Sequence, residues 1–283
     1  METVTIVGVG LIGGSFGLAL RKAGFDGRLI GVSSPGAVRD GLARGAIDEG
    51  LPLDEGVAAA DLVFLAQPIA RIIDTLGRIE PWLRPGALVT DAGSTKARIV
   101  AQGCRTIRRG QFLGGHPMAG KETRGAGGAD ADLFAGRTWV LTPEAPDELE
   151  TPAAQKFRRW LEAIGAVVVT MPPAEHDRVV ARTSHLPQLL STALALTLAG
   201  ELGSADQLRA AGPGLSDMVR LAGSSYEIWR DILSTNSGAI DGALARFIAQ
   251  LEQIRARLTS DGMEQAFAAA NEFAARLREA RGR

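Results

Sequence analysis

Histidine is rare in this chain, with three among 283 residues. One of them, His116, stands in the stretch FLGGHPMAGKE, where a short apolar run meets a turn rich in glycine. An imidazole titrates near neutral pH, so it can take a proton from a substrate hydroxyl. A histidine in a tight turn can also do no more than hydrogen-bond to backbone carbonyls. The place of His116 after a strand-like run favours the catalytic role, and we expect it to act as a general base.

Other polar residues stand where they could join His116. The stretch TDAGSTK follows another strand-like run and presents Ser94 and Lys96. Ligands of open α/β sheets bind at the carboxyl ends of strands, so Ser94 is expected near His116. In TSHLPQ, His185 begins a long apolar stretch, where it either binds substrate or caps a helix; we expect a function. His176, in PAEHDRVV, is expected to be an exposed residue at a helix start, without a function.

An arginine and a tryptophan near the end of the chain form a further candidate. In DMVRLAGSSYEIWRDI, Arg220 and Trp229 are nine residues apart, across an expected helix break at 223–225. An isolated arginine is usually a solvated surface charge. A guanidinium can also bind a carboxylate through two parallel hydrogen bonds. For an anionic substrate, we expect Arg220 to bind a carboxylate, with the aromatic ring nearby.

The elements that must position these residues fall into two parts. Up to about Met171, short β-branched runs alternate with helical stretches, which predicts an α/β fold with a mainly parallel, doubly wound sheet. Beyond it, Ala/Leu-rich stretches repeat apolar residues with helical spacing, and the one at about 181–199 is apolar enough to need a bundle or a dimer interface. We place a domain boundary at Pro172-Pro173, giving domains 1–172 and 173–283. The expected strands are TVTIVGV, RLIGVS, DLVFLAQ, ALVTDAG, FLGGHP, TWVLTP and AVVVTM.

The first expected strand runs into G-x-G-x-x-G, formed by Gly8, Gly10 and Gly13. Gly8 permits the tight turn, Gly10 lets the backbone approach a pyrophosphate, and Gly13 allows close helix packing. The helix that follows offers free N–H groups to the anion, beginning at Leu11 and Ile12. A structural turn is the alternative, but the position after the first strand favours a dinucleotide site.

The choice between NAD and NADP depends on the end of the second expected strand. An NAD site would carry an acid there for the ribose 2′-hydroxyl, but this chain has Ser33 and Ser34. The serines can hydrogen-bond to a 2′-phosphate without repelling it, and Arg39 supplies charge if its helix turns that way. We therefore expect NADP over NAD, although a polar loop would accept either. Gln67 and Pro68, after the run DLVFLA, are assigned to the same cofactor site.

Charge and composition exclude several classes of partner. The net charge is −1 and no Lys/Arg run occurs, so a small-molecule substrate is expected rather than a nucleic acid. Cys104 is the only cysteine, which indicates a reducing compartment, and we expect the cytoplasm. The N-terminal apolar run is short, glycine-rich and not preceded by basic residues, so neither a signal peptide nor a membrane span is expected. The histidines and carboxylates show no metal-ligand spacing, and no metal is expected.

Taken together and in this order, the segments GVGLIGGS, DAGSTK, GGHPMAGKE, TSHLPQ and RLAGSSYEIWRDI resemble the prephenate/arogenate dehydrogenase family of tyrosine biosynthesis. The resemblance covers essentially the whole chain. It implies a Rossmann-like domain followed by a helical dimerisation domain, and hence a homodimer. It also implies oxidative decarboxylation, in which the substrate ring loses hydride from C4 to NAD(P) and carbon dioxide from C1.

The resemblance also assigns roles to residues. His116 takes the place of the histidine that accepts the C4 hydroxyl proton, and Ser94 that of a serine hydrogen-bonded at the same site. His185 and Arg220 match substrate-binding positions, with Arg220 pairing a carboxylate and Trp229 lining the pocket. We expect neither a chorismate mutase before the first strand nor a regulatory ACT domain after the last helix.

The sequence departs from the family pattern at one position, and two alternative functions stay open. Many relatives have a small hydroxyl residue where this chain has Lys121; with Arg124, Lys121 either helps to hold a dianionic substrate or is a solvated loop charge. A β-hydroxyacid dehydrogenase would need a lysine in its helical part, but none follows Lys156. A nucleotide-sensing module without chemistry is the non-enzymatic alternative. The residues do not decide between prephenate and arogenate, or whether tyrosine inhibits.

Overall fold

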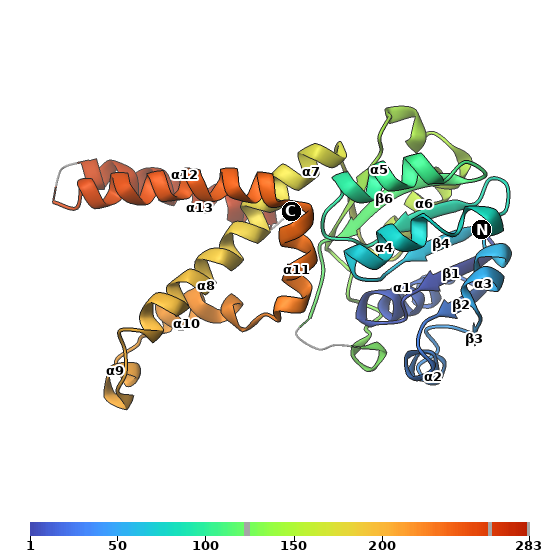
Figure 1. Ribbon diagram of the computed structural model, residues 1–283, viewed down its shortest axis with the longest axis horizontal. Helices are drawn as coiled ribbons and strands as arrows, with labels where there is room; N and C mark the ends of the chain where they lie inside the picture. The colour runs from blue at the N-terminus through green and yellow to red at the C-terminus, as the bar shows by residue number, and fades with distance from the viewer. Residues whose placement is uncertain (122–124, 260–261, 282–283) are drawn as a thin grey trace. The chain divides into compact units, whose positions relative to one another are not determined.

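The computed structural model describes residues 1–121, 125–259 and 262–281. Its centre is an eight-stranded sheet in the order β3-β2-β1-β4-β5-β6-β7-β8 (Figure 1). Neighbouring strands are parallel throughout, except that β6 and β7 are antiparallel. The strands are β1 (Thr3–Val7), β2 (Arg28–Val32), β3 (Glu49–Gly50), β4 (Leu62–Leu65), β5 (Leu88–Asp91), β6 (Gln111–Pro117), β7 (Thr138–Thr142) and β8 (Val167–Thr170).

The predicted fold class is confirmed, and each expected strand is present. The sequence analysis missed β3, because its two residues are too few to show a periodic pattern. Among the described residues, every strand ends by Thr170, and those that follow are helical or irregular. The domain boundary predicted at residue 172 lies where strands are succeeded by helices. That it separates two domains stays a prediction.

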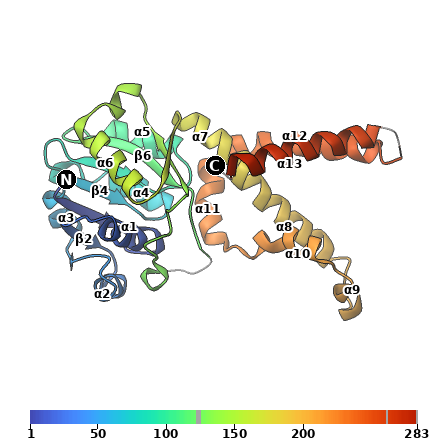
Figure 2. The ribbon, with the colours of Figure 1, turned by 180° about the vertical axis from the view of Figure 1, so that it is seen from behind.

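Helices cover both faces of the sheet (Figures 1 and 2). Phe16 of α1 packs on Phe64 of β4, with ring centroids 4.4 Å apart, and on Trp139 of β7 at 5.7 Å. Thr5 of β1 faces the opposite side, where its hydroxyl donates to the carbonyl of Gly56 in α3. The elements between and beside the strands are α1 (Leu11–Lys22), α2 (Pro35–Ala43), α3 (Leu53–Ala59), α4 (Ile69–Leu76), η1 (Glu80–Trp82), α5 (Ala97–Thr106), η2 (Ala126–Gly128), η3 (Pro146–Leu149) and α6 (Pro152–Ala163).

The predicted apolar helix at 181–199 is present, but its first turn is a π-helix. Pro187 has no N–H, so the bond to the carbonyl four residues earlier cannot form there, and a wider turn precedes it. The helix break expected at 223–225 is also present. The elements after the sheet are α7 (Pro173–Val180), η4 (Ala181–His185), α8 (Leu186–Ala199), α9 (Ala205–Arg209), α10 (Pro213–Val219), η5 (Arg220–Gly223), α11 (Tyr226–Thr235), α12 (Ser237–Ala256) and α13 (Gly262–Arg281).

The chain divides into two compact units, Met1–Ser237 and Gly238–Arg283. The first unit holds the sheet and the helices through α11. The second holds α13 and nearly all of α12, and it exposes a set of large apolar side chains: Ile248, Leu251, Leu258, Phe267, Phe273 and Leu277. Within the described ranges, no helix combines the length and apolarity needed to span a bilayer.

Candidate active site

The glycine turn between β1 and α1 has the geometry that its spacing predicts. Gly8 has a φ of +100°, and a Cβ there would lie 2.4 Å from the carbonyl oxygen of Ala66. A Cβ at Gly13 would lie 2.1 Å from the carbonyl oxygen of Gly8, so larger residues are excluded at both positions. At Gly10, no atom of the described residues lies within 4 Å of the Cβ position. The start of α1 carries no acidic residue, so its amides and its dipole favour an anion in that space.

A cavity of about 630 Å³, here called the glycine-loop cavity, lies beside this turn. Its lining includes Gly8 and Gly10 together with Ser33 and Ser34 from the end of β2. Arg71 of α4 also lines it. Arg71 is exposed and makes no hydrogen bond or ion pair within the described part of the chain. Arg39, the arginine that the sequence suggested, is not among the described residues that line this cavity.

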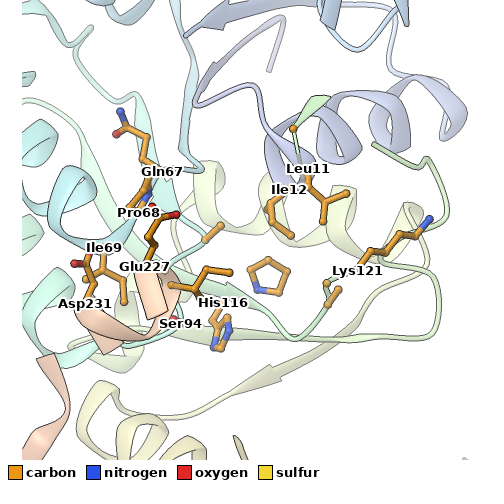
Figure 3. Close-up of a pocket in the computed structure, with 17 residues that line it drawn as sticks. Leu11, Ile12, Gln67, Pro68, Ile69, Ser94, His116, Lys121, Glu227 and Asp231 are labelled. Atoms are coloured by element: carbon orange, nitrogen blue, oxygen red, sulfur yellow. The ribbon is translucent and has the colours of Figure 1, made fainter. Parts of the chain in front are cut away.

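A second cavity of about 540 Å³, the His116 cavity, lies next to the first (Figure 3). Gln67, Pro68 and Gly125 line both cavities, so the two cavities are adjacent. Its size is typical of small-ligand pockets. Its other lining residues are Leu11, Ile12, Ile69, Ala92, Gly93, Ser94, His116, Pro117, Ala119, Gly120, Lys121, Glu227, Ile228 and Asp231.

Helix α11 forms one wall of the His116 cavity, and side-chain hydrogen bonds fix its position. Asp231 is buried, and its Oδ2 accepts the amide of Ala70 in the first turn of α4 at 3.0 Å. The hydroxyls of Thr235 and Thr95 lie 2.8 Å apart. These contacts join α11 to the segments that follow β4 and β5, so the wall is held against the ends of the strands.

His116 is connected to a second histidine and a carboxylate. Its Nδ1 lies 2.8 Å from Nε2 of His176, and Nδ1 of His176 lies 2.9 Å from Oδ1 of Asp177. Asp177 accepts two backbone amides, from Lys96 at 2.7 Å and from Ala97 at 2.9 Å. A continuous chain of hydrogen bonds therefore runs from the catalytic candidate at the end of β6 to the first turn of α7.

The prediction that His176 is exposed is wrong. It does lie in the first turn of α7, but its side chain is 0% exposed because this turn packs against the loop before α5. The sequence contained a signal for this. Pro173, His176, Asp177 and Val180 have the spacing of one helical face, and all of them are buried.

Beneath His116 lies a buried ion pair. The ammonium of Lys96 contacts Oδ2 of Asp91 and donates to the carbonyl oxygen of Gly115 at 2.7 Å, and both charged side chains are 0% exposed. The other oxygen of Asp91 accepts the amide of Gly115 at 3.1 Å, and Oδ2 also accepts the amide of Gly93 at 2.8 Å. Burial lowers the pKa of Lys96, and Asp91 opposes that shift. The pair joins the carboxyl ends of β5 and β6.

The surroundings of His116 keep it neutral. Burial lowers its pKa well below the ordinary 6.5, and His176, Lys96 and His185 lower it further. Burial alone would raise the pKa of Asp177, but hydrogen bonds from His176 and from the amides of Ala97 and Lys96 lower it below its usual value. At neutral pH, His116 is thus a neutral imidazole with a single N–H, and Asp177 is an ionised carboxylate.

The other predicted residues are brought together only in part. Ser94 lines the His116 cavity, and its hydroxyl has no hydrogen-bond partner among the residues that the structure describes. Lys121 also lines this cavity, but its ammonium pairs with Asp130 at 2.6 Å and is exposed, and Figure 3 shows it pointing away from His116. Arg124 lies outside the described residues.

His185 and Trp229 lie next to each other, with ring centroids 5.8 Å apart in an edge-on arrangement. His185 is 1% exposed, and burial lowers its pKa to about 4. Its Nδ1 lies 3.4 Å from the amide of Asn236, which donates to the backbone carbonyl of Asp177. Arg220 is exposed on η5. Of the described residues that line the His116 cavity, none is His185, Arg220 or Trp229.

Across residues 1–121, 125–259 and 262–281, no cluster of histidine, cysteine and carboxylate side chains has the geometry of a metal site. The polar groups described above are instead arranged along hydrogen bonds and ion pairs. Chemically, the arrangement offers an anion-binding turn and a neutral imidazole, each at one of two adjacent cavities.

Two family models match the chain. One, described as the nucleotide-binding domain of prephenate dehydrogenase, matches residues 16–170, and the other, described as its dimerization domain, matches residues 172–272. Prephenate dehydrogenase of Lactococcus lactis subsp. cremoris (strain MG1363) is 31% identical over 264 residues, which cover 92% of this chain and 72% of that protein.

Solved structures give the same result. Prephenate dehydrogenase from A. aeolicus, in complex with hydroxyphenyl propionate and NAD+, superposes with a TM-score of 0.87 at 30% identity, over 99% of this chain and 98% of that one. Arogenate dehydrogenase of Synechocystis superposes with a TM-score of 0.79 at 31% identity, over 99% and 98% of the two chains.

Proposed function

This chain belongs to the prephenate dehydrogenase family, and we propose that it oxidises prephenate, arogenate or both with loss of carbon dioxide, using NADP or NAD. It is an oxidoreductase, as its relatives are. The observation that carries the proposal is the position of His116, a neutral imidazole at a cavity that shares lining residues with the glycine-loop cavity.

The dinucleotide fits the residues present. Gly8, Gly10 and the start of α1 at Leu11 would hold its pyrophosphate, because the space before Gly10 is open and the amides of α1 favour an anion. Ile12, Gln67 and Pro68 would line the path towards His116. When bound, the nicotinamide accepts the hydride that leaves the substrate ring.

In this proposal His116 takes the proton of the C4 hydroxyl as the C4–H bond breaks. A base must be in its neutral form to accept a proton, and the lowered pKa of His116 keeps the imidazole neutral at neutral pH. The hydroxyl of Ser94, which lines the same cavity, would hydrogen-bond to the substrate hydroxyl and orient it. The remaining task of the site is to position the ring, since aromatisation drives the loss of carbon dioxide.

Binding of a substrate carboxylate is assigned to Arg220, and His185, Trp229 and Lys121 are proposed to contact the same substrate. A guanidinium is suited to a carboxylate, with which it can form two parallel hydrogen bonds. Because Arg220, His185 and Trp229 do not line the His116 cavity among the described residues, their roles rest on the family resemblance of their segments.

NADP is proposed as the preferred cofactor. The end of β2 carries Ser33 and Ser34 in place of an acid, so nothing there repels a 2′-phosphate. Arg71 lines the same cavity and has no partner among the described residues, so its charge is available. We also propose a homodimer, supported by the match to a dimerization domain and by the exposed apolar side chains of α12 and α13, and a cytoplasmic location.

The test is turnover on each pairing of prephenate or arogenate with NADP or NAD, followed by the absorbance of the reduced nicotinamide. A signal with NADP that exceeds the signal with NAD supports the full proposal and identifies the substrate. If no pairing gives an absorbance change, the proposed activity is wrong, and a nucleotide-binding module without catalysis becomes the better interpretation. The β-hydroxyacid alternative predicts turnover on a hydroxyacid instead, but the chain has no lysine after Lys156 to support it.

A further inference from the structure

The buried pair His176 and Asp177 has no role in the reaction described so far. We propose that these two residues fix the tautomer of His116, so that its Nδ1 carries the proton and its Nε2 presents a lone pair to the cavity. The inference rests on the proposed function of His116 as a base. His176 and Asp177 are then positioning residues, which act through His116 and do not touch the substrate.

Asp177 ends the series of hydrogen bonds that starts at His116. Its carboxylate accepts the amides of Lys96 and Ala97 on different oxygens, at 2.7 and 2.9 Å. These donors hold Asp177 in its ionised form, and an ionised carboxylate only accepts hydrogen bonds. The ring nitrogen of His176 that lies 2.9 Å away, Nδ1, must therefore be the donor.

His176 lies between Asp177 and His116 in this series. Burial lowers its pKa below 6.5, although Asp177 opposes the shift, so the ring is neutral and carries one N–H. That N–H is already committed to Asp177. Its other nitrogen, Nε2, is an acceptor, and it lies 2.8 Å from Nδ1 of His116. Nδ1 of His116 must then be protonated, which leaves Nε2 of the neutral ring as the lone pair.

This tautomer is the one that base catalysis requires. A serine protease fixes its histidine in the same way, through a buried aspartate on Nδ1. The charged groups near His116 are Lys96 and Asp91, which form the buried ion pair, and Asp177, which ends the series of hydrogen bonds. The ring of His185 is a further titratable group nearby. When Nε2 takes the substrate proton, His116 becomes positively charged. The ammonium of Lys96 disfavours this charge, whereas the carboxylate of Asp177, connected to His116 through His176, favours it.

The test uses the full-length protein with ¹⁵N-labelled histidine. Only three imidazoles are present, so the ring-nitrogen NMR signals can be assigned with single His→Asn variants. At neutral pH, we expect His116 of the wild-type protein to be protonated at Nδ1 and not at Nε2. A wild-type spectrum in which Nε2 of His116 carries the proton would overturn the inference without any variant, and without any measurement of activity.

Variants of His176 then test the cause. In His176→Phe, the Nδ1–H of His116 would be buried without an acceptor, so the proton should move to Nε2. The tautomer that can act as the base, with the proton on Nδ1, then leaves a buried donor without an acceptor and is less stable. We therefore expect kcat to fall by roughly 10- to 100-fold with little change in KM. His176→Gln offers an acceptor oxygen again and should restore the tautomer and most of kcat.

The matched control is Glu175→Gln, which removes an exposed side chain from the same turn of α7. It should change neither the tautomer nor kcat. If His116 keeps Nδ1–H in His176→Phe, the pair does not set the tautomer, and the inference is wrong. Absence of turnover with every substrate would instead count against the proposed function, because the tautomer of His116 is measured independently.

Discussion

The floor of the His116 cavity and the rim of the glycine-loop cavity differ in burial and in hydrogen-bond partners. The floor is defined as the buried, hydrogen-bonded group formed by Asp91, Lys96, His116, His176 and Asp177. Of these five, only His116 is among the described residues that line the cavity, and the others lie behind it. The rim consists of Ser33, Ser34 and Arg71, which are exposed. On the floor, each charge has a fixed neighbour, whereas the Arg71 side chain meets no partner among the described residues.

The difference separates two tasks. Groups that do chemistry need a defined protonation state, and burial with fixed partners supplies it. Groups that recognise a phosphate need to stay available for the ligand, and exposure allows that. If this division is correct, changes on the floor should affect kcat or stability strongly, and changes on the rim should affect cofactor preference modestly.

The largest effect is expected for His116→Asn. Without the base, kcat should fall by ~10²- to 10⁴-fold, and KM should change little because the substrate contacts remain. Steady-state kinetics with the better substrate measure this, and circular dichroism verifies the fold. Glu162→Gln, an exposed change on α6, is the control and should leave kcat unaltered. Turnover near the wild-type rate in His116→Asn would show that His116 is not the general base.

The next effect concerns stability. Lys96→Met leaves Asp91 buried without its partner, and the free energy of unfolding should fall by about 3–5 kcal/mol. Lys22→Met breaks the exposed pair with Asp132 and should cost less than about 1 kcal/mol. Urea denaturation of both variants measures the difference. Equal losses would contradict the contrast between buried and exposed pairs.

Arg220→Gln should act on binding. Loss of a charged hydrogen bond to a carboxylate should raise KM for the substrate by about tenfold or more, with a smaller effect on kcat. Arg209→Gln, at another exposed arginine of the helical region, is the matched control. If the two variants have the same KM, Arg220 does not bind the substrate.

The smallest effect is expected at the rim. Arg71→Ala should raise KM for NADP by roughly tenfold and leave KM for NAD nearly unchanged, because only NADP carries the 2′-phosphate. Arg39→Ala is the control, since Arg39 is not among the described residues that line the cavity. A loss of NADP preference in Arg39→Ala and not in Arg71→Ala would reverse the assignment.

Sequence reasoning predicted most of the fold, because buried parallel strands are continuous apolar runs that stand out from amphipathic helices. It placed His116 and the glycine turn at the carboxyl ends of strands, where the structure has them. It did not predict the burial and the hydrogen bonds of His176 and Asp177, because these depend on α7 packing against the loop before α5. The choice between Arg39 and Arg71 likewise depends on two helices that are far apart in the sequence, so the local pattern at β2 could not decide it.

The most direct test of the central claim, that the floor holds His116 as a neutral base, is the pH dependence of kcat/KM for the wild-type protein. A base is inactive when protonated, so kcat/KM falls as the pH drops through the pKa of the base in the free enzyme. Because the pKa of His116 lies well below 6.5, we expect kcat/KM to stay level from neutral pH to well below 6.5 and only then to decrease. A decrease that begins at pH 6.5 or above would show that His116 has an ordinary pKa and would contradict the account.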